Sequence, residues 1–322
     1  MILKFADWFV YGIVGLDPET HLGQALNFFV YDTIKILFLL FLVSTIMGVI
    51  NAYFPIQRLR HFLTTRKLYG LQYLFAAVFG SITPFCSCSS VPLFIGFVKG
   101  GIPLGVTFSY LITSPLVNQI AVAMFLGAFG WKATLTYLFS SILMGTFGGW
   151  LLGKMRLEPL LTDWVLALQR QSEREAAEWQ EQNLSFWKRL PQICRDSWGI
   201  TRGVVPYVLI GIGIGAAMHG YVPENFFEHW LRKDNLFAVP AAVIAAVPIY
   251  ANAAAIVPVI QVFVAKGIPL GTALAFMMAV VGLSLPEAMM LKKVMTLKLI
   301  GIFFATVTSF IIILGYFFNL IL

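Results

Sequence analysis

Long apolar runs make up most of the chain, and polar residues gather in short intervals between them. A helix needs about 20 apolar residues to cross a bilayer, and these runs do not alternate between apolar and polar residues as the strands of a transmembrane barrel do. The pattern therefore predicts an all-α polytopic membrane protein. The runs expected to contribute spanning helices are 28–54, 104–126, 134–152, 204–218, 270–291 and 297–320.

Two further apolar segments are interrupted near their centres. Residues 71–99 break at the polar stretch 83–90, and residues 236–266 break at 248–252; each break contains a proline. Backbone that leaves a helix at membrane depth is tolerated only where it is buried in protein or lines a watery cavity. Each break therefore predicts part of a central cavity, whether the segment crosses the membrane or returns to the same side as a re-entrant hairpin.

Composition agrees with a membrane protein. Hydrophobic residues make up 59% of the 322 residues and charged residues 11%, whereas soluble domains are nearer a quarter charged. The net charge of +7 does not indicate nucleic-acid binding, because the basic residues form short clusters between apolar runs, as the positive-inside rule describes. The three cysteines do not predict a disulfide framework. The aromatic segment 1–27 is too short to span and is expected to be retained and to lie in the membrane interface.

The chain repeats itself. Gly-Ile-Pro-Leu-Gly at 101–105 recurs at 267–271, an offset of 166, and Pro92 corresponds to Pro258 at the same offset. Interrupted segments in matching positions of two repeats are typical of secondary transporters. We therefore predict an N-terminal interfacial segment (1–27), a first transmembrane repeat (28–153), a charged cytoplasmic loop (154–202) and a second transmembrane repeat (203–322).

The distribution of basic residues decides between parallel and inverted copies. If each broken segment is a full crossing, the basic connector 57–67 lies on the opposite side from the basic loop 154–202. If each is a re-entrant hairpin, sixteen of the 22 basic residues lie inside, and the less basic connector 224–235 lies outside. The positive-inside rule favours the second arrangement. We therefore predict two inverted repeats, each with three spanning helices and one re-entrant hairpin.

Small polar side chains and thiols are concentrated at the two predicted hairpin tips and in the spans beside them. Free N–H groups at the start of each second arm favour a polar or anionic solute, and the thiols of a C-x-C pair can bind a soft ligand. The alternative is that these residues only cap the half-helices, pack closely, or make helix–helix hydrogen bonds. The candidate substrate-binding residues are Pro84, Cys86, Ser87, Cys88, Ser89, Ser90, Asn118, Tyr250, Asn252 and Ser284.

Acidic residues are rare in the spans. Glu287 is the only acid in the C-terminal spans, and it is a candidate proton carrier because an ionisable side chain inside the membrane is a functional candidate by default. The alternative is an ion pair with Lys292 or Lys293 near the inner face. Asp32 and Lys35 are three residues apart near a membrane boundary, and they are expected to form an interfacial pair. No metal site or cofactor is predicted.

Several of these motifs resemble one family. They are Pro-Phe-Cys-Ser-Cys-Ser-Ser at 84–90, the Gly-x-Pro-Leu-Gly that follows, Thr-Ser-Pro-Leu-Val-Asn at 113–118 and Leu-Ser-Leu-Pro-Glu at 283–287. They are similar to motifs of the predicted permeases that include YraQ and the ArsP-type organoarsenical efflux permeases. The resemblance covers most of the chain apart from the N-terminal segment and the middle loop. It implies a bacterial or archaeal inner-membrane permease with about eight predicted spans, a count that treats the broken segments as crossings.

The predicted function is that of an inner-membrane secondary permease rather than an enzyme, and the chain has no Walker A motif for ATP hydrolysis. A small solute would pass through a midplane site between the two tips, and the resemblance implies efflux of a trivalent organoarsenical or another soft-ligand compound. One alternative is uptake of a small sulfur-containing anion. An alternative of another class is a membrane thiol oxidoreductase that cycles Cys86 and Cys88. The expected partners are the solute and the lipid bilayer, without nucleic acid, and a homo-oligomer is left open.

Overall fold

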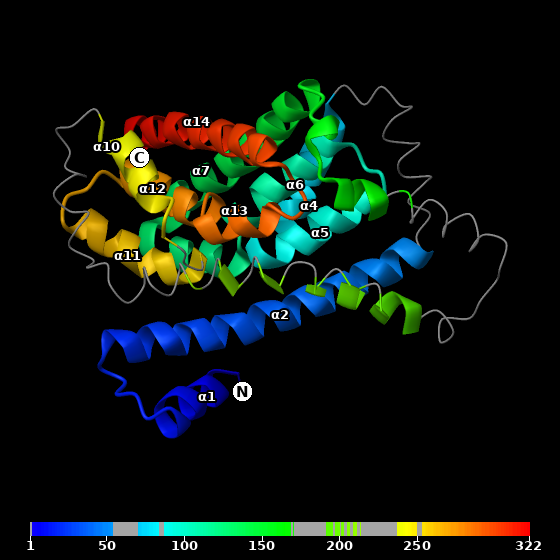
Figure 1. The fold of residues 1–322 in the computed structure, drawn as a ribbon. Helices are drawn as coiled ribbons and strands as arrows, with labels where there is room; N and C mark the ends of the chain where they lie inside the picture. Colours follow the sequence, from blue (N-terminus) through cyan, green and yellow to red (C-terminus); the bar gives the residue numbers. More distant parts are fainter. Residues whose placement is uncertain are drawn as a thin grey trace.

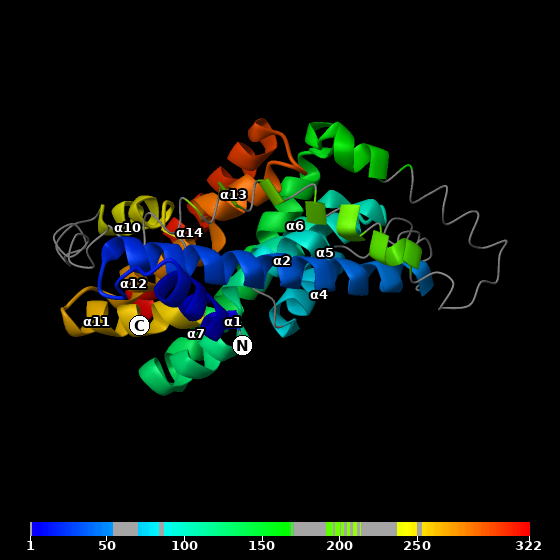
Figure 2. The same ribbon diagram turned by 60° about the horizontal axis from the view of Figure 1, so that its bottom comes forward.

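The structure is a computed structural model, and it describes residues 2–53, 70–83, 87–168, 237–249 and 253–322, with shorter pieces at 170, 191–195, 197–199, 201–202, 205–206, 209–210 and 213. Within these residues the chain is helical, and the one pairing of extended residues is an isolated antiparallel bridge between Leu161 and Met295. Helices from both halves of the sequence pack into one bundle (Figures 1 and 2). The predicted all-α class is therefore confirmed.

The N-terminal segment folds back on the first long helix. Helix α1 (Ile2–Asp7) continues into a π-helix, η1 (Trp8–Ile13), and α2 (His21–Tyr53) follows. The side-chain amide of Asn27 donates a hydrogen bond of 2.8 Å to Asp7 Oδ1, which holds α1 beside the first turns of α2 (Figure 1). Helix α2 begins at His21, seven residues before the predicted start of the span at 28, and the position of the membrane boundary on this helix stays a prediction. The interfacial position of residues 1–27 stays a prediction.

Two series of helices follow, and two pairs of helices in them have equal lengths. The first comprises α4 (Leu71–Ile82), α5 (Ser87–Lys99), α6 (Leu104–Leu116) and α7 (Gln119–Lys154). The second comprises α10 (Ala238–Ala246), α11 (Ala253–Ala265), α12 (Leu270–Gly282), α13 (Leu285–Leu291) and α14 (Leu297–Ile321). Helices α5 and α11 have 13 residues each, and so do α6 and α12. Each of these pairs is displaced by 166 residues, as the sequence repeat predicts.

The predicted spans 104–126 and 270–291 are each two helices rather than one. The backbone leaves the helical conformation two residues after Pro115, where φ is −104° and ψ is 77°. In the second run it does so three residues before Pro286, where φ is −132° and ψ is 20°. Proline accounts for both breaks, because it has no N–H to continue a helix and is accepted only in the first turn of the next one. Both predicted spans therefore contain a break in the helix, and the run 270–291 as a whole is still long and apolar enough to cross a bilayer.

The residues beyond the first of these breaks, 119–126, belong to helix α7. It includes the predicted span 134–152 and has a kink at Gly130, where φ is 76° and ψ is 180°. That backbone conformation is almost confined to glycine. A 3-10 turn, η2 (Glu158–Leu160), follows the helix. The last predicted span, 297–320, matches α14.

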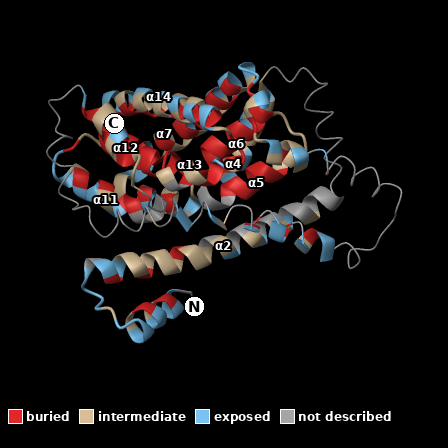
Figure 3. Ribbon diagram, viewed as in Figure 1, coloured by how far each residue is buried: buried red, intermediate tan, exposed pale blue. Residues whose placement is uncertain are grey.

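Helices α6 and α12 form the centre of the bundle. All residues of α6 are buried, as are residues 271–282 of α12 (Figure 3). Each packs against the long helix of its own half through glycines, which allow close approach in a membrane protein. A Cβ on Gly105 of α6 would lie 2.8 Å from the carbonyl oxygen of Gly149 on α7, and a Cβ on Gly271 of α12 would lie 2.5 Å from the carbonyl oxygen of Gly315 on α14.

Three stretches of the described chain are long and apolar enough to cross a bilayer. They are Ala121–Lys154 in α7, Leu270–Leu291 across α12 and α13, and Leu297–Ile321 in α14. Large apolar side chains on the outside of α7 and α14 are exposed, such as Phe139 (65%) and Ile313 (62%). Such a surface suits lipid rather than water. The chain is a multi-pass helical membrane protein.

A clasp joins the segment after α7 to the connection before α14, where residues 160–162 lie against residues 293–296. The backbone N–H of Thr162 donates to the carbonyl of residue 294 over 3.0 Å, and its hydroxyl donates to the carbonyl of residue 293 over 2.8 Å. In return, the N–H and the hydroxyl of Thr296 donate to Leu160 O over 3.1 and 2.8 Å. The start of the predicted charged loop is thereby fixed to the second half of the chain, while residues 171–190 lie outside the described part.

Candidate functional site

The connection that follows each broken segment has the same structure in both halves. Gly101 and Gly267 have φ angles of 76° and 88°, which glycine adopts without steric cost. The N–H of the isoleucine after each glycine donates to the carbonyl five residues earlier, over 3.0 Å in both halves. The proline at the N-cap of α6 and of α12 has φ of −52° and −56°, respectively. The repeat of Gly-Ile-Pro-Leu-Gly in the sequence is thus a repeat of local structure.

The first break lies between α4 and α5. Helix α4 ends at Ile82, Thr83 is extended (φ −77°, ψ 124°), and α5 begins at Ser87. The end of a helix leaves carbonyl groups without partners, and here Gln119 supplies the donor. Its Nε2 lies 3.1 Å from Ser81 O and 2.7 Å from Ile82 O. The first residue of α7 therefore closes the end of α4.

The second break, between α10 and α11, is closed from the equivalent place. Leu285 is the first residue of α13, and its backbone N–H donates to Val247 O over 3.1 Å. At the offset of 166, Leu285 corresponds to Gln119 and Val247 corresponds to Ser81. A backbone donor thus takes the place of a side-chain amide, and the two breaks are closed in the same way. We call these two contacts the closures.

Two of the predicted site residues precede the closures directly. Asn118 is half-buried in the break before Gln119, and its Oδ1 accepts a hydrogen bond of 3.4 Å from Ala121 N, as at a helix N-cap. The sequence predicts Asn118 within the span 104–126. In the structure it lies in the break between α6 and α7, because α6 ends one residue after Pro115. Ser284 precedes Leu285, is fully buried, and its hydroxyl has no hydrogen-bond partner among the described residues.

Ser90 links the first turn of α5 to the end of α6. Its hydroxyl lies 2.9 Å from that of Ser114, and both residues are fully buried. Ser114 is in the last turn of α6, one turn before Asn118. Tyr137 of α7 donates from its hydroxyl to Leu116 O over 2.7 Å. The start of α5, the end of α6 and α7 are therefore held together by hydrogen bonds beside the first closure.

The other predicted binding residues are described in part or not at all. Those outside the described residues are Pro84, Cys86, Tyr250 and Asn252. Those whose backbone forms the first turn of α5, but whose side chains are outside the described part, are Ser87, Cys88 and Ser89. Their roles in binding stay predictions.

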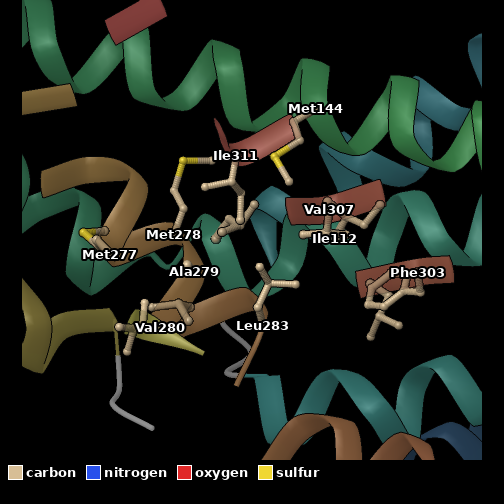
Figure 4. Close-up of a cluster of buried hydrophobic side chains, with 14 of the residues drawn as sticks. Ile112, Met144, Met277, Met278, Ala279, Val280, Leu283, Phe303, Val307 and Ile311 are labelled. Carbon is tan, nitrogen blue, oxygen red and sulfur yellow. The ribbon is translucent and has the colours of Figure 1, made fainter. Parts of the chain in front are cut away.

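Contacts between the halves bring the regions around the two closures into one neighbourhood. Helix α5 packs against α13 of the second half, and α11 packs against α7 of the first. Helices α6 and α12 meet at their ends, where a Cβ on Gly282 would lie 3.4 Å from Leu116 Cδ2. These two residues are equivalent positions at the offset of 166. Apolar side chains that include Ile112 of α6, Met278 of α12 and Ile311 of α14 join the same helices in the core (Figure 4).

Glu287 belongs to the short helix that makes the second closure. It lies in the first turn of α13 and is 3% exposed. Of the two lysines expected as its partners, Lys292 is exposed, and the ammonium of Lys293 lies 5.3 Å from the ring centre of Trp164, a cation–π contact. Helix α13, which carries Glu287, packs on α5, the second arm of the first broken segment.

Sequence reasoning missed Gln119 and Ser114 as parts of this region. Both are polar residues in an apolar run beside Asn118, and a buried amide or hydroxyl in a membrane helix is itself a sign of a hydrogen-bonding role. Their partners at Ser81 and Ser90 are far away in the sequence, so the pairs become visible only in the folded chain.

The model of one protein family, described as a predicted permease (ArsP_1), matches residues 21–320. A UPF0718 protein of Methanocaldococcus jannaschii is 21% identical over 316 residues, covering 78% of this chain and 83% of that protein. A Streptococcus mutans protein, whose name calls it a candidate subunit of a two-component membrane permease complex, is 29% identical over 132 residues, covering 40% of this chain and 43% of that protein. No solved structure matches the chain.

Proposed function

The chain belongs to the predicted permease family (ArsP_1), and on this premise we propose that it is a secondary permease that moves a small solute across the cell inner membrane. The solute passes through a midplane site formed by the two breaks and the residues around their closures. The observation that carries this proposal is that the two breaks are closed from equivalent positions. Broken helices in matching positions of two repeats are the usual place of the binding site in secondary transporters.

The contacts between the halves support two repeats related by a two-fold axis, and the distribution of basic residues favours the inverted arrangement. Where two units are related by a two-fold axis, residue i of one touches residue j of the other and the reverse also holds. Helix α5 packs on α13 while α11 packs on α7, and α13 corresponds to the first residues of α7 at the offset of 166. Leu116 lies against its own equivalent, Gly282. Such contacts are expected near the axis.

The lengths of the arms support re-entrant hairpins. Helices α5 and α11 have 13 residues each, which at ~1.5 Å per residue is about 20 Å. The hydrocarbon core of a bilayer is ~30 Å thick. Each arm therefore reaches the interior of the membrane without crossing it, and both tips lie near the midplane. The two ends of each hairpin are then on one side, as the distribution of basic residues also favours.

The proposed site combines polar and soft groups. Backbone N–H groups at the start of α5 favour a polar or anionic part of the solute, and the thiols of Cys86 and Cys88 favour a soft atom such as trivalent arsenic. Asn118 and Ser284 contribute an amide and a hydroxyl from beside the two closures. The remaining residues proposed for the site are Pro84, Ser87, Ser89, Ser90, Tyr250 and Asn252.

Glu287 is proposed to couple transport to protons. Its carboxyl group is buried in the first turn of α13, and a carboxylate inside a membrane is costly unless it is paired or takes up a proton. Because Glu287 lies one turn after Ser284, a change of its charge acts directly on the helix that closes the second break.

Flux measurements on a panel of solutes test the proposal. Methylarsenite, arsenite, thiosulfate and copper are followed into and out of cells that lack their own exporters. We expect methylarsenite to leave faster from cells with the wild-type protein, and we expect Asn118→Ala and the double variant Cys86→Ser/Cys88→Ser to lose this effect. Cys194→Ser, which changes the remaining cysteine outside the proposed site, is the matched control and should behave as wild type.

The other outcomes separate the alternatives. If the double cysteine variant transports normally while Asn118→Ala fails, the cavity stands but the thiols only pack, and the substrate belongs among oxyanions or polar organic molecules. Entry of thiosulfate in place of arsenical efflux favours uptake of a sulfur-containing anion. Rapid labelling of Cys86 and Cys88 from the outer face of intact cells favours the thiol oxidoreductase. If no panel solute moves faster with the wild-type protein, a permease for this class of solutes is contradicted.

Assembly is a separate proposal. The S. mutans relative is named for a two-component complex, and this chain is correspondingly proposed to work as a homo-oligomer or beside a second subunit. Light scattering of the purified protein in detergent distinguishes a monomer from a homo-oligomer. Co-purification from the native membrane reports a second subunit.

A further inference from the structure

Asp32 is buried rather than exposed on the surface of α2. Its side chain is 8% exposed, whereas the ammonium of Lys35 lies 5.1 Å from the ring centre of Tyr31. Asp32 follows Phe28 and Phe29 by one helical turn, and both of these residues pack against the main apolar core. Residues three and four apart share a face of a helix. Asp32 therefore lies on the face of α2 that is turned toward the bundle.

Helix α5 is the shared neighbour of the helices that carry the buried acids. It packs against α2, which carries Asp32, and against α13, which carries Glu287. Among the described residues these two are the buried acidic side chains. Thr33, next to Asp32, also has a buried hydroxyl oxygen, which forms no hydrogen bond within the described part of the chain. The second arm of the first broken segment thus packs against two helices that each carry a buried acid.

We propose that Asp32 is a second proton-binding carboxylate of the same transport cycle. This inference rests on the proposed permease function and goes beyond the role given to Glu287. The carboxylate of Asp32 takes up one proton to become a neutral carboxylic acid and later releases the same proton to the other side. A buried charge is costly, so the charged and the neutral forms favour different packing of α2 on the bundle, to which α5 belongs. The position of α5 then depends on protonation at both flanks.

Other titratable groups surround α2. The elements packed on it are α5, α1 and η1, and the pieces near Trp198 and Gly213 also reach it. The described titratable side chains on these elements and on α2 itself are Lys4, Asp7, Tyr11, Tyr31, Lys35, Lys99, Cys194, Arg195 and Arg202. Asp7 is bonded to Asn27, and Lys35 lies over Tyr31. The experiment therefore has to measure the protonation of the Asp32 carboxyl group itself, because the pH response of the whole protein includes these other groups.

Chemical labelling reads the carboxyl group without a known substrate. N,N′-dicyclohexylcarbodiimide adds to protonated carboxyl groups in apolar surroundings, and peptide mass spectrometry locates the product. In the purified full-length protein we expect labelling of Asp32 and Glu287 that falls at least about tenfold from acidic to alkaline pH, and little labelling of the exposed Glu158 at any pH. Absence of labelling at Asp32 under conditions that label Glu287 would overturn the proposal.

Flux in vesicles with an imposed pH gradient tests the consequence. With methylarsenite as the probe, we expect Asp32→Asn to lose the acceleration by the gradient and Asp32→Glu to restore it. Glu158→Gln is the control and should respond as wild type. If Asp32→Asn responds to the gradient as wild type does, the inference about Asp32 is contradicted, while the proposed permease function is not. Absence of flux in the wild type contradicts the proposed function instead, and the labelling result then stands by itself.

Discussion

Replacement of Gly149 by alanine tests how closely α6 and α7 approach each other. A Cβ at this position would lie 2.6 Å from Gly105 O and 2.7 Å from Ser109 N, and it would also overlap the Ser109 hydroxyl. Backbone atoms of a buried helix cannot turn aside as a flexible side chain can. The two helices must therefore move apart by about 0.8 Å to restore an ordinary contact of 3.4 Å.

The free energy lost by this separation follows from the dispersion contacts between the helices. Each pair of contacting heavy atoms contributes about 0.1–0.2 kcal/mol, and a gap of about 0.5–1 Å removes a quarter to a half of it. Over a few tens of atom pairs the loss is about 1–3 kcal/mol, the usual range for overpacked cores. Alanine favours the helix over glycine by up to ~1 kcal/mol, which offsets only part of the loss.

Gly127 provides the matched control in the same helix, because a Cβ there has no neighbour within 4 Å. Thermal unfolding of the purified proteins in detergent should show a lower Tm for Gly149→Ala, by about 2–4 °C for each kcal/mol. Gly127→Ala should unfold at the wild-type temperature or above it. If both variants unfold at the same temperature, the close approach of α6 and α7 is refuted.

Three further predictions concern single contacts and can be checked by the same unfolding assay. Asn319→Leu removes both hydrogen bonds of 3.1 Å between Asn319 and Thr272, and we expect a loss of about 0.5–2 kcal/mol; an unchanged Tm would argue against this link between α14 and α12. Gly130→Ala meets no neighbouring atom but forces alanine into a conformation that costs about 1–3 kcal/mol, so a Tm equal to that of Gly127→Ala would show that the kink is absent. Gln119→Leu removes the donor from the carbonyls at the end of α4; because these bonds are exposed, we expect a lower Tm equivalent to about 0.5–1.5 kcal/mol, and an unchanged Tm would contradict a stabilising role of this closure.

The apolar pattern predicts the fold class and the repeat because both depend on local sequence. Spans of apolar residues need no partner to be recognised, and the two copies of Gly-Ile-Pro-Leu-Gly share an offset that the helices α5 and α11, and α6 and α12, reproduce. The extra breaks after Pro115 and before Pro286 were not predicted, although proline marks both. Apolar residues continue on either side of each break, and hydropathy alone does not distinguish one bent segment from two helices.

The candidate site could be predicted only at the level of segments. The sequence indicates that Asn118 and Ser284 are equivalent and lie in apolar surroundings, and the structure places both beside closures. It does not indicate that Gln119 bonds Ser81, that Ser90 bonds Ser114, or that the side chain of Asp32 is buried. Each of these facts depends on how helices that are distant in the sequence pack together, and no pattern along the chain contains that information.

The clasp shows that the chain joins the second half earlier than its composition indicates. By composition the second half begins after residue 202, but Thr162 is already hydrogen-bonded to the connection before α14, in which Thr296 returns two bonds to Leu160. A polypeptide severed between 171 and 190 would therefore yield two fragments that each keep one side of the clasp and can recombine. A cut before residue 160 would remove that tether from the first fragment. Division of this chain into two separately encoded proteins is thus compatible with its architecture only if the division follows residue 162, so that the first protein keeps its part of the clasp.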